Sequence, residues 1–207
     1  MKPEWAEENL KTIRTLMERS AVYRRALAPI MIFVGFVGVL GAATGLSFHF
    51  NSLRSFGELW LFTAFVAIIG AFLIARRQAL KDCEPFWSAP TKRVAQALLP
   101  SLTGGMCFGV VFLVPDVKNE FTLLLVVLWM FFYGCALHAA GFFMPRGVKI
   151  FAWIFVAGAG VLLFVMSPLA HVEMKLNAHC LMGLFFGGLH LACGAYLYLT
   201  EKKNPVV

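Results

Sequence analysis

Charged residues are scarce in this chain of 207 residues: they make up 14% of it, whereas about one quarter of a typical soluble domain is charged. Apolar residues make up 60%, and the mean hydropathy is +0.78. A compact soluble domain cannot bury so large an apolar share, and a disordered chain has the opposite balance of few apolar and many charged residues. The composition therefore excludes both classes and predicts a membrane protein.

Cysteine is also sparse and irregularly placed. The five cysteines, at positions 83, 107, 135, 180 and 193, have neither the density of a disulfide-stabilised secreted domain nor the spacing of a structural zinc site. The sequence lacks a glycine-rich phosphate-binding loop, a Gly-x-Ser-x-Gly nucleophile motif and a His-Glu-x-x-His zinc motif. These absences argue against an enzyme that works through a nucleotide or a motif of the soluble hydrolases.

Six apolar runs are long enough to cross the hydrocarbon core of a bilayer, which takes about 20 helical residues. They cover residues 26–48, 59–75, 94–114, 121–144, 150–167 and 178–199. The runs are continuous, whereas the strands of a membrane barrel alternate apolar and polar residues. The sequence therefore predicts an all-α fold, a polytopic membrane bundle of six transmembrane helices within residues 26–200, followed by a short tail at 201–207.

Lysine and arginine gather in alternate connections between these runs. Fifteen of the 18 basic residues precede the first run, follow the sixth, or lie between the second and third or the fourth and fifth. The other three, Arg54, Lys118 and Lys175, lie one in each remaining connection. The positive-inside rule then places both termini in the cytoplasm, with the chain in the inner membrane. The same asymmetry accounts for the net charge of +7, so the lipid bilayer rather than nucleic acid is the expected partner.

Two segments on the predicted cytoplasmic side are candidate contact surfaces. Residues 1–25 have apolar side chains at helical spacing and predict an amphipathic helix that lies on the membrane or the bundle, or docks on a partner. Between the second and third runs, Pro85 and Pro90 rule out one continuous helix. Phe86 and Trp87 between them are expected to anchor this connection at the headgroup level or to contact a partner or a lipid headgroup.

Histidines within the runs are the first place to look for function, because polar groups inside a membrane are costly. His138 and His190 lie in the fourth and sixth runs, which are expected to point the same way and to hold the two imidazoles at similar depth. His179 shares a helix face with His190 and several glycines, which would give a flat macrocycle room, and His49 is expected near the level of His179. These four histidines are candidate ligands of haem b or a divalent metal. The alternative is a packing hydrogen bond from each to a neighbouring helix.

A second candidate metal site lies in the last connection on the predicted outer side. His171, Glu173 and His179 combine imidazole with carboxylate, a donor set that suits zinc, manganese or iron. The alternative is that these polar residues simply face water in a short loop.

Glycines four residues apart predict faces on which helices pack closely, because lipid provides no hydrophobic force between helices. Such pairs are Gly41 and Gly45, Gly105 and Gly109, and Gly183 and Gly187. Pro100, followed by Gly104 one helical turn later, is expected to kink or loosen the third run. A broken helix of this kind forms the binding site of some transporters.

Three functions remain open at this point. The leading one is a non-enzymatic accessory, sensory or regulatory membrane protein that contacts a cytoplasmic or membrane protein, or a second copy of itself, through its N-terminal helix and Phe86–Trp87. The second is a haem- or metal-binding electron-transfer protein that uses His138 and His190. The third is a small-solute transporter or channel built around the third run.

Overall fold

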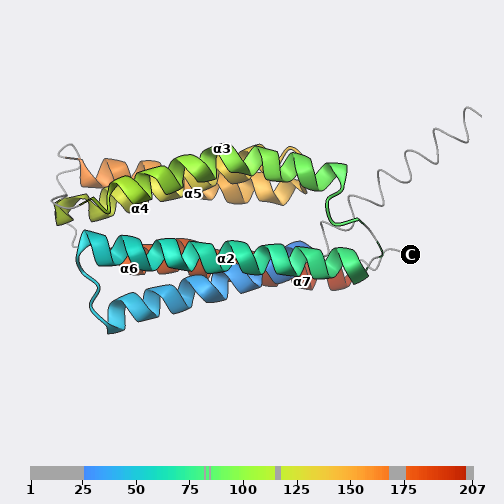
Figure 1. The fold of residues 1–207 in the computed structure, drawn as a ribbon, viewed down its shortest axis with the longest axis horizontal. Helices are drawn as coiled ribbons and strands as arrows, with labels where there is room; N and C mark the ends of the chain where they lie inside the picture. The colour runs from blue at the N-terminus through green and yellow to red at the C-terminus, as the bar shows by residue number, and fades with distance from the viewer. Residues whose placement is uncertain (1–25, 82, 84, 115–117, 168–175, 204–207) are drawn as a thin grey trace, which may run out of the picture.

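The computed structural model describes the chain except for residues 1–25, 82, 84, 115–117, 168–175 and 204–207 (Figure 1). The described residues are helical and contain no strand, and six of their helices are long and apolar enough to cross a membrane. The predicted all-α architecture with six apolar spans is thereby confirmed, and the chain is a multi-pass membrane protein. The amphipathic helix predicted over residues 1–25 lies outside the described residues.

The first two spans are a helix over Ala26–Ser47 and α2 (Leu53–Lys81). The next three are α3 (Ala89–Val111), α4 (Thr122–Ala140) and α5 (Arg146–Met166), with a 3-10 turn, η1 (Asn119–Phe121), leading into α4. The sixth span is made of α6 (Ala178–Met182), the π-helical segment η3 (Gly183–Gly188) and α7 (Leu189–Lys203).

The spans form two layers (Figure 1). One layer contains α3, α4 and α5, and the other contains the first helix, α2 and the sixth span. Aromatic side chains join the layers: Phe56 of α2 stacks with Trp129 of α4 at 6.1 Å between ring centroids. Farther along the bundle, Phe155 of α5 meets Phe186 of η3 at 5.2 Å.

Within the second layer, the first helix and the sixth span pack backbone against backbone. A Cβ added at Gly38 would lie 2.5 Å from the carbonyl oxygen of Phe186, and one at Gly35 would lie 2.6 Å from the amide nitrogen of Leu191. The glycines predicted to mark a packed face of the sixth span do so, since Gly187 meets Val39 of the first helix. Only residues without a side chain allow two helices to approach so closely.

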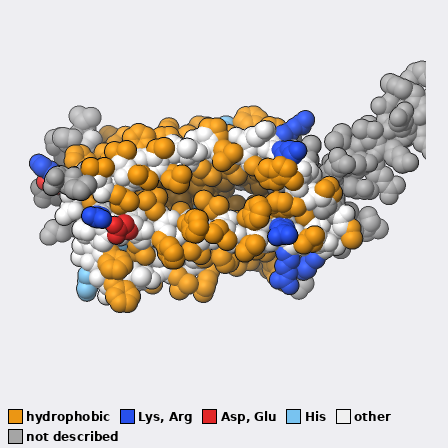
Figure 2. Space-filling model, viewed as in Figure 1, with side chains coloured by type: hydrophobic (Ala, Val, Ile, Leu, Met, Phe, Trp, Pro, Cys, Tyr) orange, Lys and Arg blue, Asp and Glu red, His pale blue; other side chains and the backbone are white. Residues whose placement is uncertain are grey.

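The surface of the bundle is largely apolar, with cations gathered at one end (Figure 2). Exposed side chains on α2 include Phe62, Phe65 and Ile68. The exposed cations at the end of α2 and the start of α3 are Arg76, Arg77, Lys81, Lys92 and Arg93. We call this end of the molecule the basic end and the other the opposite end.

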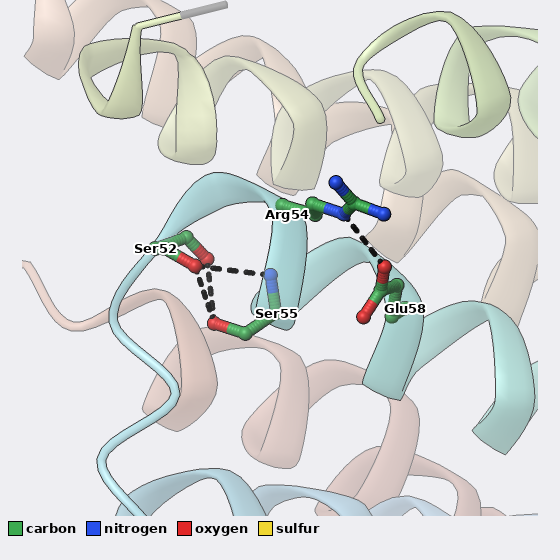
Figure 3. Close-up of polar contacts among 4 residues, drawn as sticks. All are labelled: Ser52, Arg54, Ser55 and Glu58. Atoms are coloured by element: carbon green, nitrogen blue, oxygen red, sulfur yellow. Dashed lines mark hydrogen bonds and ion pairs between the residues drawn. The ribbon is translucent and has the colours of Figure 1, made fainter. Parts of the chain in front are cut away.

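Polar capping explains why α2 begins at Leu53 rather than at residue 59, where the apolar run begins. Ser52 Oγ accepts a hydrogen bond from the Ser55 amide at 3.1 Å, as an N-cap residue does (Figure 3). Arg54 Nε donates to Glu58 Oε1 at 2.9 Å in the first turns (Figure 3). The first turns of α2 are helical but polar, so a search for apolar residues places the start of this helix too late.

A proline and a glycine mark two further helix ends. Pro90 lies in the first turn of α3, where its missing N–H is not needed, so α3 begins at Ala89 rather than at residue 94. α4 ends at Ala140 rather than at 144, with Gly141 as its C-cap residue. α3 runs as one α-helix through Pro100. The π-helical segment of the described chain lies in the sixth span, and a kink at Pro100 stays a prediction.

Candidate functional site

His190 is completely buried near the start of α7. Its Nε2 lies 2.6 Å from the hydroxyl oxygen of Tyr133, and its Nδ1 lies 3.2 Å from the carbonyl oxygen of Phe185. A carbonyl oxygen only accepts hydrogen bonds, so Nδ1 carries the proton and donates to it. In the neutral form of the ring, Nε2 then accepts from the Tyr133 hydroxyl. Both nitrogens of this imidazole therefore have partners inside the bundle.

Aromatic rings enclose the imidazole of His190. The centroids of Phe151, Tyr133 and Phe155 lie 5.0, 5.4 and 5.6 Å from it, and that of Phe186 lies at 6.2 Å. These rings come from α4, α5 and η3, so three separate segments meet at one histidine. They occupy the space beside the ring that a cofactor would need.

The glycines of the sixth span do not open a space beside His190, contrary to the expectation from the sequence. A Cβ at Gly183 would lie 2.7 Å from the Cβ of Ala42, and one at Gly194 would lie 2.8 Å from the Ile32 amide nitrogen. The first helix therefore occupies the room that the glycines leave. A haem iron could bind His190 Nε2 only if the bond to Tyr133 were broken.

The π-helical segment η3 precedes His190 directly. The Leu189 amide donates to the carbonyl of Leu184, five residues earlier, so the turn is wider than in an α-helix. The carbonyl of Phe185 in this segment accepts the proton of His190 Nδ1. We did not predict η3 from the sequence; the signal is the presence of three glycines, Gly183, Gly187 and Gly188, within six residues.

His179 is the second buried histidine, and it lies at the opposite end of the bundle in α6. Trp60 Nε1 donates to its Nδ1 at 3.2 Å, and its Nε2 lies 3.0 Å from the carbonyl oxygen of Phe50. Because an indole N–H only donates, Nδ1 is the acceptor and Nε2 carries the proton. The ring lies so close to Gly45 that a Cβ there would overlap it. His179 thus connects the first helix, α2 and the sixth span.

His49 does not share this site. It follows the end of the first helix with a φ of 54°, and its side chain is exposed. The group that reaches His179 is the backbone carbonyl of the next residue, Phe50. The structure shows no hydrogen bond or ring contact between these two described imidazoles, and their joint use as cofactor ligands stays a prediction.

His138 has different ring neighbours from His190. Its ring meets Phe142 at 5.5 Å and Trp153 at 5.6 Å. Trp153 is 58% exposed and projects from α5 away from Phe151, because two residues along a helix correspond to a rotation of about 200°. No ring contact between described residues joins His138 to His190. Their joint use as cofactor ligands remains an untested prediction.

The metal site predicted at the opposite end is only partly described. His171 and Glu173 lie outside the described residues, and His179 is occupied by Trp60 and Phe50. Among the residues that the structure describes, no group of three His, Cys, Asp or Glu side chains is placed to hold a metal ion. The metal site at His171, Glu173 and His179 therefore remains a prediction.

The two aromatic residues of the connection between α2 and α3 differ in exposure: Phe86 packs against α2, and Trp87 is exposed. The ring of Phe86 packs edge-on against Phe72 of α2 with centroids 4.8 Å apart. Trp87 is 55% exposed. Phe86 thus attaches the connection to α2 and leaves Trp87 available for contact at the basic end.

No protein-family model matches the sequence, and no curated protein or solved structure is significantly similar to it. The fold defines the class as an α-helical multi-pass membrane protein. Its function has to be inferred from this chain's own residues.

Proposed function

We propose that the protein is a non-enzymatic accessory, sensory or regulatory component of the cytoplasmic membrane. The observation that supports this most is the pairing of the buried histidines within the bundle. His179 bonds to Trp60 and Phe50, and His190 bonds to Tyr133 and Phe185. Polar groups paired in this way stabilise helix contacts. Because the nitrogens of both buried histidines already have partners, the side chains that a partner protein can contact are those on the surface.

The orientation is part of the proposal. The exposed cations of the basic end lie on α2 and α3 on either side of the connection that, by the distribution of Lys and Arg, faces the cytoplasm. The opposite end carries Arg54 and Glu58, which pair with each other. Both termini and Trp87 then lie on the cytoplasmic side.

The contact surface that we propose consists of Trp87 and the exposed cations of the basic end. Exposed tryptophan is enriched at the energetic centres of protein interfaces. Cations beside it favour a partner with an acidic surface, because complementary charge steers association. The segment 1–25, predicted to be an amphipathic helix, would add to this surface on the same side of the membrane.

Site-specific photo-crosslinking in intact cells tests this proposal. A photoreactive phenylalanine analogue replaces Trp87 in one variant and Trp153 in the control, two tryptophans that are 55% and 58% exposed. We expect a discrete protein adduct from position 87, identified by mass spectrometry, and only lipid adducts from position 153, which lies within the apolar span α5. Lipid adducts alone at both positions would contradict a protein partner at Trp87.

An absorption spectrum tests the same proposal by asking whether His190 binds haem. Protein purified after expression with ample haem should give the same visible spectrum before and after His190→Ala, since the proposed role of His190 is packing. A Soret band in the unchanged protein that His190→Ala abolishes would contradict the proposal and establish the electron-transfer alternative.

A further inference from the structure

The helices α2 and α3 are in contact at the opposite end of the bundle. A Cβ at Gly57 would lie 2.8 Å from Leu113 Cδ2, and one at Gly109 would lie 3.1 Å from Leu61 Cδ2. Gly57 and Leu61 mark the face of α2 in this contact, Gly109 marks the face of α3, and Leu113 lies in the turn that follows α3. Toward the basic end, the same faces are no longer covered.

The exposed side chains along these faces show that α2 and α3 are farther apart toward the basic end. Ile68 lies three turns after Gly57 on the same face of α2, and it is 59% exposed. Met106 and Leu99 lie two turns apart on one face of α3, within about 60–80° of Gly109 around the helix, and they are 57% and 58% exposed. The space-filling view shows a hollow between the two layers, lined by hydrophobic atoms and open on the side of α2 and α3 (Figure 2). We call this hollow the α2–α3 groove.

Cations stand where the groove meets the basic end. Arg76 and Arg77 come from the last turns of α2, and Lys92 and Arg93 come from the first turns of α3. All four side chains are exposed, and the ion pair described in this structure, between Arg54 and Glu58, lies at the opposite end. Phe86 and Trp87 lie in the connection between these two sets of cations.

We propose that the α2–α3 groove binds one anionic phospholipid, with an acyl chain between the two helices and the headgroup at Arg76 and Lys92. The groove is apolar and opens toward the hydrocarbon, so an acyl chain fills it without leaving polar groups unpaired. The cations at its end are drawn from both helices, and basic side chains of this kind attract anionic headgroups. This proposal does not depend on a protein partner at Trp87.

Native mass spectrometry of the full chain in detergent tests the headgroup contact. Dioleoyl phosphatidylglycerol and dioleoyl phosphatidylcholine are added at equal concentration, and we expect one phosphatidylglycerol to be retained in preference. The double variant Arg76→Gln with Lys92→Gln should bind phosphatidylglycerol about tenfold more weakly or worse. The matched control, Arg54→Gln with Lys118→Gln at the opposite end, should bind as the unchanged protein does. Equal retention of the two lipids would overturn the proposal.

A second pair of variants tests the acyl-chain contact. Ala64 is exposed and lies two turns after Gly57 on the face of α2 that borders the groove. Ala64→Trp should therefore block the groove and abolish retention, whereas Ala157→Trp, at an exposed position on α5, should not. If Ala64→Trp proves unstable, Ile68→Trp at another exposed position replaces it. Undiminished binding in a folded groove variant, or displacement of the lipid by soluble glycerophosphoglycerol, would mean that the headgroup alone is bound and would overturn the groove.

Discussion

Gly38 is the described glycine at which an added Cβ would come closest to a backbone atom of another span. Gly38→Ala places a Cβ 2.5 Å from the carbonyl oxygen of Phe186, and a backbone atom cannot yield unless the two helices move apart. We expect a loss of about 1–3 kcal/mol in the free energy of unfolding, measured as a lower thermal midpoint in detergent.

Gly160→Ala is the matched control for this substitution. Gly160 also lies within a span, but a Cβ there meets nothing within 4 Å. Alanine forms helix better than glycine by about 1 kcal/mol, so this variant should be neutral or slightly more stable. Equal losses from the two substitutions would show that helix propensity or lipid contact, and not the approach to Phe186, sets the cost.

Tyr133 supports His190 through one hydroxyl. Tyr133→Phe removes that donor and leaves Nε2 of a fully buried imidazole without its partner. Hydrogen bonds between membrane helices contribute about 0.6 kcal/mol on average and up to about 1.7 kcal/mol, and we expect a loss in this range. Tyr198→Phe, at a residue of α7 that is 58% exposed, should leave the thermal midpoint unchanged. A loss of the same size from both would assign the effect to the substitution itself rather than to His190.

The histidines also show how far sequence reasoning reaches at the scale of single residues. The cost of a polar group in the membrane was enough to select His190 and to place it within the sixth run. Its partner was not predictable, because Tyr133 lies 57 positions away, and Trp60 lies 119 positions from His179. Such pairs depend on how the helices are arranged, and a single sequence carries no signal for that.

The six spans were predictable at the scale of elements because each is a long apolar run. Some of their ends were less so, because α2 begins at a serine cap before its apolar run. The end of α2 at Lys81 does follow from the sequence, because long basic side chains keep their charges in water while their stems cover apolar surface. The π-helical segment is the feature that hydropathy could not show. It changes hydrogen bonding and not composition.

The wide turn of η3 predicts an unequal response to two single-residue deletions. A Cβ added at Gly188 would meet no atom closer than 3.9 Å, so removal of this residue should let α6 and α7 join as one α-helix while both keep their faces. Deletion of Ala192 instead rotates the rest of α7 by about 100°. That deletion brings Ala195 to the place of Gly194, where a Cβ lies 2.8 Å from the Ile32 amide nitrogen.

We expect the deletion of Ala192 to cost about 2–4 kcal/mol more than the deletion of Gly188. Thermal midpoints of the two purified variants, both extracted in the same detergent, measure the difference. If removal of Gly188 were the more damaging, the wide turn itself would be required for the packing of His190 against Tyr133.

The two ends of the molecule differ most clearly in their charge. The basic end carries five exposed cations from α2 and α3, whereas the described charges of the opposite end, Arg54, Glu58, Lys118 and Glu120, balance one another. Moving cations across a bilayer against this bias is unfavourable, so a single orientation should dominate. This asymmetry also decides which side a partner at Trp87 and a lipid headgroup at Arg76 would come from.

Cysteine labelling measures this orientation directly. Cys83 is exposed in the connection at the basic end, and a variant that keeps it while the other four cysteines become serine reports on that end. A second variant without native cysteines carries Ser52→Cys at the opposite end, where Ser52 is exposed. A membrane-impermeant maleimide should label position 52 in intact spheroplasts and Cys83 only after the membrane is permeabilised. Labelling of Cys83 in intact spheroplasts would place the basic end outside the cell, and the proposed contacts at Trp87 and Arg76 would then have to be sought on the other side of the membrane.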